Sequence, residues 1–162
     1  MDYASKIKAL NLILPEPAKP VGSYRPVIYS SNTAYLSGQI SKSSLGIITG
    51  KVGKDVTIDQ GREAARVAAI NVISLIQHDV TFARFKKFLR ITGYVQTAPD
   101  FYDISKITDA ASDLFLEIFG ENGLHCRSSV GMHTLPLNAA VEIEATLELQ
   151  TTDNRPQTAD RR

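Results

Sequence analysis

The segment "TIDQGREAARVAAINVISLIQHD" (residues 57–79) limits the possible folds more than any other part of the chain. Small apolar residues recur in it at steps of three and four, which is the period of one face of an α-helix. This stripe consists of Ala65, Ala68, Ala69, Val72, Ile73 and Ile76. Its many alanines predict a helix that packs closely on a sheet. Thr57 and Gln60 have the spacing of a capping box, with Asp59 as a rival N-cap, so the helix should begin there.

A second helix is predicted within "PDFYDISKITDAASDLFLEIFGENG" (residues 99–123), where Gly120 is suited to end it. Its apolar stripe consists of Ile104, Ile107, Ala111, Leu114 and Ile118. Residues 2–10 can form one further short amphipathic helix, with Ile7 and Leu10 on one side.

Segments rich in β-branched and aromatic residues predict the strands. They are 27–29 and 34–40, which form a hairpin around the polar turn 30–32, then 85–97, 127–133 and 140–149, with a short strand at 47–49. A bulge is expected near Gly93 in the third of these segments.

The resulting order is β-β-α-β-α-β-β, which predicts an α+β fold with α/β layering. Two helices of similar length cross over between strands, so both should lie on one face of a mixed sheet. The other face then has no cover from this chain. A bare face of that size would be an exposed apolar patch, so we expect subunits to associate through it.

Alternation along the last two strands separates their faces. Val141 and Ile143 begin an apolar face, and Glu142 and Glu144 lie on the other side. In the preceding strand Arg127, Ser129, Gly131 and His133 alternate with Val130 and Met132. If the apolar faces pack under the helices, Arg127 lies with the glutamates on the helix-free face. Its anionic partner there is either one of those glutamates or a ligand carboxylate, which suits the planar guanidinium fork.

The bulk composition narrows the class of protein. The 162 residues suit one domain, and a net charge of +1 gives no general field for nucleic acid, which is not an expected partner. The basic run "RFKKFLR" can touch phosphates, but a solvated strand edge is the favoured interpretation. The single cysteine, Cys126, excludes an intrachain disulfide and favours the cytoplasm. No targeting or membrane-spanning segment is expected.

No metal site is expected, because His78, His125 and His133 lack the spacing of metal ligands. His125 and Cys126 are a formal nucleophile pair, but adjacent residues rarely face each other. By segments, we expect an N-terminal helix and proline-rich stretch (1–23) packed on a main domain (24–150), followed by a flexible polar tail (151–162).

Four stretches together resemble one known family. They are "YLSGQI", the alanine-rich helix, the helix start "APDF" and the closing block "RSSVGMHTLPLNAAVEIEA". From about Tyr24 to Leu149 the chain is similar to the YjgF/Rid family (RidA, L-PSP endoribonuclease-like), in a longer bacterial-type subgroup. The resemblance implies a chorismate-mutase-like fold whose last strand lies within the sheet. It also implies a homotrimer with a central β-barrel and clefts between subunits.

The resemblance further implies an enamine/imine deaminase that hydrolyses 2-aminoacrylate-like intermediates to 2-keto acids and ammonia. By motif match, Arg127 grips the substrate carboxylate and Glu142 orients or activates water, with no metal or cofactor. A backbone group near Ser129 helps to place that water, and Ser129 stands where many members have cysteine. Ser105 stands where the cleft has asparagine.

Further cleft residues follow from the same match. Tyr24 resembles the tyrosine that closes the cleft, and Ser37 and Gly38 resemble the pair that borders it. One alternative is a non-catalytic protein that binds small carboxylates or metabolites at the same clefts. Another is an endoribonuclease or translation inhibitor, against which the near-neutral charge argues.

Overall fold

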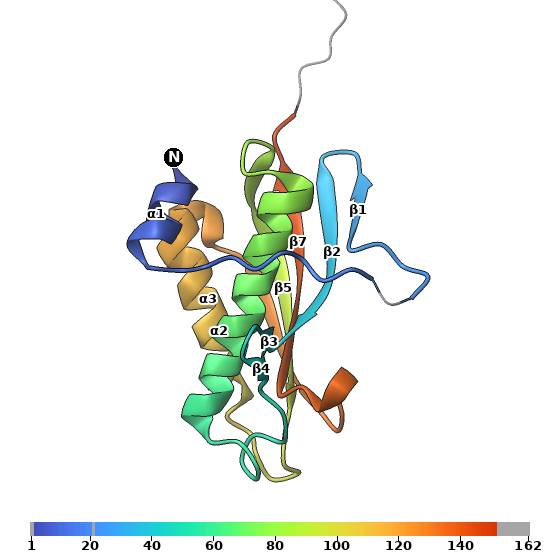
Figure 1. Ribbon diagram of the computed structural model, residues 1–162. Helices are drawn as coiled ribbons and strands as arrows, with labels where there is room; N and C mark the ends of the chain where they lie inside the picture. The colour runs from blue at the N-terminus through green and yellow to red at the C-terminus, as the bar shows by residue number, and fades with distance from the viewer. Residues whose placement is uncertain (1, 21, 152–162) are drawn as a thin grey trace, which may run out of the picture.

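A computed structural model describes residues 2–20 and 22–151 (Figure 1). A five-stranded sheet has the order β1-β2-β7-β5-β6, and β3 and β4 form a separate small hairpin. The strands are β1 (Val27–Ser30), β2 (Thr33–Ile40), β3 (Lys42–Ser43), β4 (Gly46–Ile47), β5 (Phe85–Gln96), β6 (Cys126–Met132) and β7 (Val141–Leu149). The helices are α1 (Tyr3–Ala9), α2 (Ile58–Leu75) and α3 (Ile104–Phe119). The two long helices lie side by side on one face of the sheet, as expected (Figure 1).

The strand pairing confirms the mixed sheet implied by the family resemblance. The last strand, β7, lies between β2 and β5 and is antiparallel to both. It does not pair with its sequence predecessor β6, which lies at the edge and runs parallel to β5. The connection from β6 to β7 can therefore be long and contain Pro136.

Helix α2 begins at the predicted capping box. The Thr57 side chain accepts from the Gln60 backbone N–H, and the Gln60 side chain accepts from the Thr57 backbone N–H. The alanines Ala64, Ala65 and Ala68 are fully buried, which lets the helix lie close against β7 and β2. The helix ends in a π-helical turn, Ile76–Val80.

The prediction of a bulge near Gly93 is wrong. The register of β5 against β7 shifts between Phe85 and Lys87 and between Phe88 and Arg90 instead. Gly93 has another reason to be glycine, because a Cβ there would lie 3.2 Å from the Thr108 Cβ and still closer to its Cγ2. Glycine at this position lets α3 approach the sheet.

An aromatic cluster joins the N-terminal helix to the end of α3. Tyr3 of α1 packs edge-on against Phe85 and lies 4.9 Å from Phe119 between ring centroids. Its hydroxyl accepts from the Asn122 side chain at 3.0 Å. The segment after α1 then crosses α2, where the Ser74 hydroxyl donates to the Pro15 carbonyl (Figure 1). The N-terminal segment is therefore packed on the same core as the sheet.

The two faces of the last strands follow the prediction in β7 but not in β6. Val141, Ile143 and the alternate residues after them are buried toward the helices, and Glu142 and Glu144 lie on the uncovered face. In β6, however, Arg127 and Ser129 face α3, so the prediction that Arg127 lies on the helix-free face is wrong.

The reason for this orientation lies on α3. The helix presents polar side chains to β6, and these hydrogen-bond Arg127 and Ser129. Gly131 of β6 faces the same side, where a Cβ would lie 2.9 Å from the Ile104 Cδ1. Val130 points the other way and is 37% exposed.

Candidate functional site

Arg127 forms the centre of a polar cluster between β6 and α3. Its Nη2 donates to Asp109 Oδ1 at 2.8 Å, and its Nη1 donates to Ser112 Oγ at 2.9 Å. The Arg127 side chain is 22% exposed and that of Asp109 is 46% exposed. The guanidinium is thus fixed from two sides, while part of the side chain still reaches solvent.

His125 holds the Ser112 end of this cluster. Its Nδ1 lies 2.6 Å from the Gly123 carbonyl, which can only accept, so Nδ1 carries the proton. Burial, reinforced by the Arg127 charge, lowers the pKa of His125 and favours the neutral ring. The unprotonated Nε2 then accepts from the Ser112 hydroxyl, 3.0 Å away. Because that hydroxyl donates to His125, its oxygen is left to accept from Arg127.

Ser129 continues the cluster along β6. Its hydroxyl lies 2.6 Å from that of buried Thr108, which in turn lies 3.1 Å from the Ser105 carbonyl. Since the carbonyl only accepts, the Thr108 hydroxyl donates to it, and the Thr108 oxygen accepts a hydrogen bond from the Ser129 hydroxyl. Ser105 joins this chain of hydrogen bonds through its backbone carbonyl, and the residue itself is exposed. Three of the predicted site residues, Arg127, Ser129 and Ser105, therefore lie together.

Glu142 belongs to a second group, on the uncovered face. A Cβ at Gly38 would lie 2.7 Å from the Glu142 Cδ and closer still to Oε1, so a larger residue there would displace this carboxyl group. Burial, together with the charge of Glu144, raises the pKa of Glu142 above its ordinary value. Glu144 itself accepts from the Tyr94 hydroxyl at 3.0 Å.

Ser37 and Tyr24 lie on the β1–β2 side of this second group. Both the hydroxyl and the backbone N–H of Ser37 donate to the Pro26 carbonyl. That contact fixes the backbone at Pro26, two residues after Tyr24. Tyr24 itself is 53% exposed. Ser37, Gly38 and Glu142 thus form one group, with Tyr24 on the segment that approaches it.

The structure does not bring the two groups together within one chain. Arg127 and Ser129 lie on the helix side of the edge strand β6. Glu142 lies on the opposite face of β7, which is separated from β6 by β5. A single chain therefore holds two separate groups of candidate residues, the Arg127 group and the Glu142 group, which we term half-sites.

Sequence reasoning missed Asp109 and Ser112. A signal was present, because Ser105, Thr108, Asp109 and Ser112 recur at steps of three, one and three, which places them on one side of α3. This polar stripe adjoins the apolar stripe on the same helix. Its position indicates the side of α3 that meets a polar strand.

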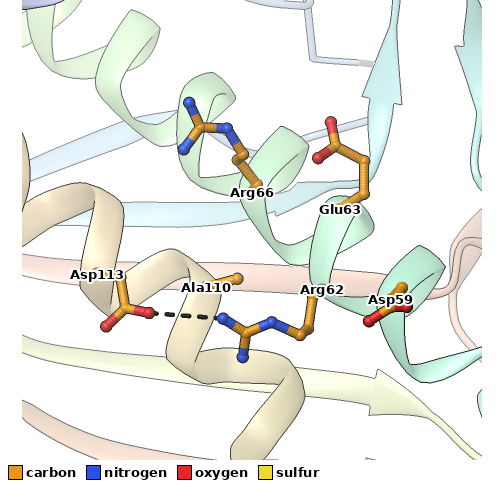
Figure 2. A pocket seen from close by; sticks show the side chains of 6 residues that line it. All are labelled: Asp59, Arg62, Glu63, Arg66, Ala110 and Asp113. Carbon is orange, nitrogen blue, oxygen red and sulfur yellow. Dashed lines mark ion pairs between the residues drawn. The ribbon is translucent and has the colours of Figure 1, made fainter. Parts of the chain in front are cut away.

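A separate groove of about 260 Å³ lies between α2 and α3 on the outside of the molecule (Figure 2). It is lined by Asp59, Arg62, Glu63, Arg66, Ala110 and Asp113. Arg62 lies 3.6 Å from Asp113 (Figure 2). It also donates to the Lys106 carbonyl. These exposed and mixed charges offset one another, so the Arg127 cluster remains the better candidate. Within residues 2–20 and 22–151, no helix has the length and apolarity to cross a membrane.

Comparison with known proteins identifies the family. The family described as "YjgF/chorismate_mutase-like, putative endoribonuclease" matches residues 4–149. The chain belongs to the YjgF family. "Protein TCP17" of Trypanosoma cruzi is 36% identical over 149 residues, which cover 90% of this chain and 93% of that protein. A 2-iminobutanoate/2-iminopropanoate deaminase of Dermatophagoides farinae is 27% identical, over 84% of this chain and 93% of its own length.

A solved structure shares the same fold. The crystal structure of Atu1372 from Agrobacterium tumefaciens, a protein of unknown function, has a TM-score of 0.85 and 32% identity. The match covers 91% of this chain and 92% of the other. The YjgF fold therefore extends over almost the whole described chain, including the segments that carry both half-sites.

Proposed function

We propose that this protein hydrolyses reactive enamine/imine intermediates of the 2-aminoacrylate type to 2-keto acids and ammonia. The observation that carries the proposal is Arg127, held by Asp109 and Ser112 at a solvent-reaching edge where a small carboxylate can contact it. Membership of the YjgF family and the relative named as an iminobutanoate/iminopropanoate deaminase support the choice of reaction.

The reaction needs little from the protein. The enamine first takes a proton on carbon and releases one from nitrogen, which gives the electrophilic imine. Water attacks the imine carbon while the Glu142 carboxylate takes a proton from it and the π electron pair of the C=N bond moves to nitrogen. Glu142 then returns this proton to the nitrogen, which gives the neutral carbinolamine. In the second stage Glu142 passes the hydroxyl proton to the nitrogen, the C–N bond breaks as ammonia departs, and the C=O bond of the keto acid forms. Arg127 contributes position, because it binds the carboxylate beside the reacting carbon.

We place this reaction at clefts between the subunits of a homotrimer. Arg127 of one subunit and the Glu142 group of the next would then complete one site, and the opposite faces of the two half-sites within one chain support this arrangement. The uncovered face carries exposed apolar side chains, including Ile28, Tyr35 and Val130, and these favour association. In this arrangement Tyr24, Ser37 and Gly38 border the cleft beside Glu142.

A coupled assay tests the activity. A second enzyme generates 2-aminoacrylate in solution, and keto-acid release is followed with and without this protein. Acceleration with at least one imine is expected, and light scattering should give about three times the 17.7 kDa chain mass. A monomer mass would remove the shared cleft. Binding of keto acids that depends on Arg127, without acceleration of any imine, would instead support a carboxylate-binding protein.

Replacing Glu142 with glutamine should lower kcat about 100-fold or more, the usual contribution of one general base. The base acts as its carboxylate, so wild-type activity should fall as pH decreases through the raised pKa of Glu142. That acid limb should disappear in Glu142→Gln. The measurement is a pH profile of kcat in the coupled assay.

Glu144→Gln is the matched control for this prediction. It removes the neighbouring charge that raises the pKa of Glu142, so the acid limb should move to lower pH while kcat at its plateau changes little.

Thermal stability gives a second check on the direction of the Glu142 pKa shift. A raised folded-state pKa means that ionised Glu142 destabilises the fold, so Glu142→Gln should raise the melting temperature at neutral pH but not below the ordinary glutamate pKa of 4.5. An acid limb retained in Glu142→Gln would assign the base to another group.

A further inference from the structure

The Arg127 cluster contains an acid that a simple carboxylate clamp does not need. Asp109 Oδ1 accepts from Arg127 Nη2 at 2.8 Å, which makes the pair neutral overall. Among the described residues Asp109 Oδ2 has no hydrogen-bond partner, and nearly half of the side chain is exposed. A ligand that reaches Arg127 therefore meets a positive group and a negative group at the same place.

From this juxtaposition the geometry points to selection of zwitterionic ligands: Arg127 binds an α-carboxylate while Asp109 binds a cationic α-nitrogen. The inference rests on the proposed function and names its substrate form as the 2-iminio acid, which carries both charges. One carbon atom separates the carboxylate from the nitrogen in such a ligand. The two protein groups are likewise adjacent, so a single small molecule can reach both.

The arrangement also separates substrate from product. A 2-keto acid keeps the carboxylate but has an uncharged oxygen in place of the nitrogen. Its attraction to Arg127 is offset by repulsion from Asp109, and its carbonyl oxygen cannot donate to Oδ2. A product that has lost its nitrogen should therefore leave more readily than an iminium ligand of the same size.

Two sets of contacts indicate that Arg127 and Asp109 form a fixed pair and that Asp109 does not move freely. Arg127 is held from the other side by Ser112, whose hydroxyl is itself oriented by His125. Asp109 lies on α3 one residue after Thr108, which is buried and bonded to Ser129 of the same strand as Arg127. Helix and strand are thus joined on both sides of the pair, so its two charges keep their spacing.

The main competing explanation is that Asp109 only occupies Arg127 until a carboxylate displaces it. The two explanations differ in what Asp109→Asn does. If Asp109 is an occupant, its removal strengthens binding of every carboxylate alike. If Asp109 binds the nitrogen, its removal strengthens binding of monoanions and weakens binding of zwitterions.

The experiment compares alanine and pyruvate, which share a three-carbon skeleton and differ in the cationic nitrogen. Calorimetric titration into the full-length protein should show that wild type prefers alanine. In Asp109→Asn the ratio of alanine affinity to pyruvate affinity should fall by about tenfold or more, since a hydrogen bond between charged groups is lost. Asp113→Asn is the control, because Asp113 lies on the same helix but pairs with Arg62 on the outer groove. It should leave the ratio unchanged.

Each outcome has a distinct meaning. A wild type that binds pyruvate as well as alanine, or that binds neither, overturns the inference. Equal strengthening of both ligands in Asp109→Asn also overturns it and leaves Asp109 as an occupant. Because both ligands are stable and no turnover is measured, a protein that fails the imine assay but shows the ratio change retains this ligand selectivity without the proposed reaction.

Discussion

Replacing Arg127 with alanine should lower kcat/KM for imine hydrolysis about 100-fold or more. The variant loses the charged fork that binds the substrate carboxylate, and two charge-assisted hydrogen bonds of this kind account for a loss of that size. Arg127→Lys keeps the charge but loses the planar fork, so its kcat/KM should lie between those of wild type and Arg127→Ala. The measurement is the coupled assay at substrate concentrations well below KM.

The fold should survive this change. Asp109 is left without its cation, but its side chain is 46% exposed and can be hydrated by solvent. Arg62→Ala is the control for loss of one arginine, since Arg62 lies in the outer groove between α2 and α3 (Figure 2). It should retain wild-type kcat/KM. Added guanidinium salt should restore part of the activity of Arg127→Ala, which a purely structural role would not allow. Activity equal to wild type in Arg127→Ala would place the carboxylate site elsewhere.

Local signals predicted the elements of this fold well. The capping box at Thr57 and Gln60 involves residues three apart, so it needs no knowledge of the rest of the chain. The alternation in β7 also predicted the two faces of that strand correctly, because the strand has a neighbour on each side in the sheet and one of its faces is fully buried. Patterns of this kind are set by near neighbours and by one continuous core.

The faces of β6 could not be predicted in the same way. Alternation divides a strand into two sets but does not say which set faces the helices. At an edge strand the apolar residue Val130 can remain partly exposed, while Arg127 and Ser129 find polar partners on α3. Gly93 was misread for a related reason, since its close neighbour Thr108 lies on a different element.

The same limit applies to the candidate site. The closing block predicted Arg127 and Glu142 as site residues, but it did not show that they lie on opposite faces of one sheet. That separation means that the proposed chemistry needs a second subunit, whereas the sequence indicated an oligomer only through the uncovered face and the family resemblance. The contact of Asp109 with Arg127 could not be predicted, because it depends on which residues of α3 lie opposite β6. No local pattern encodes that placement.

Gly123 provides the second large effect, on stability. A Cβ at this position would lie 2.6 Å from the Phe115 carbonyl carbon, 2.9 Å from the Leu116 nitrogen and closer still to the Phe115 oxygen. These are backbone atoms of α3, which cannot rotate away as a side chain can. Gly123→Ala should therefore destabilise the protein by about 3 kcal/mol, at the upper end of overpacking effects. That corresponds to a fall of about 6–12 °C in melting temperature for a domain of this size.

The same change should reach the Arg127 cluster. The Gly123 carbonyl accepts from His125 Nδ1, and His125 orients the Ser112 hydroxyl that accepts from Arg127. A displaced turn at Gly123 should therefore weaken pyruvate and alanine binding even at temperatures where the variant is folded. Gly22→Ala is the control, because the nearest atom to its Cβ would be Tyr24 Cδ1 at an ordinary 3.4 Å. It should change stability by no more than about 0.5 kcal/mol. A melting temperature of Gly123→Ala equal to that of Gly22→Ala would show that the end of α3 can move freely, and the fixed geometry of Arg127 would lose its support.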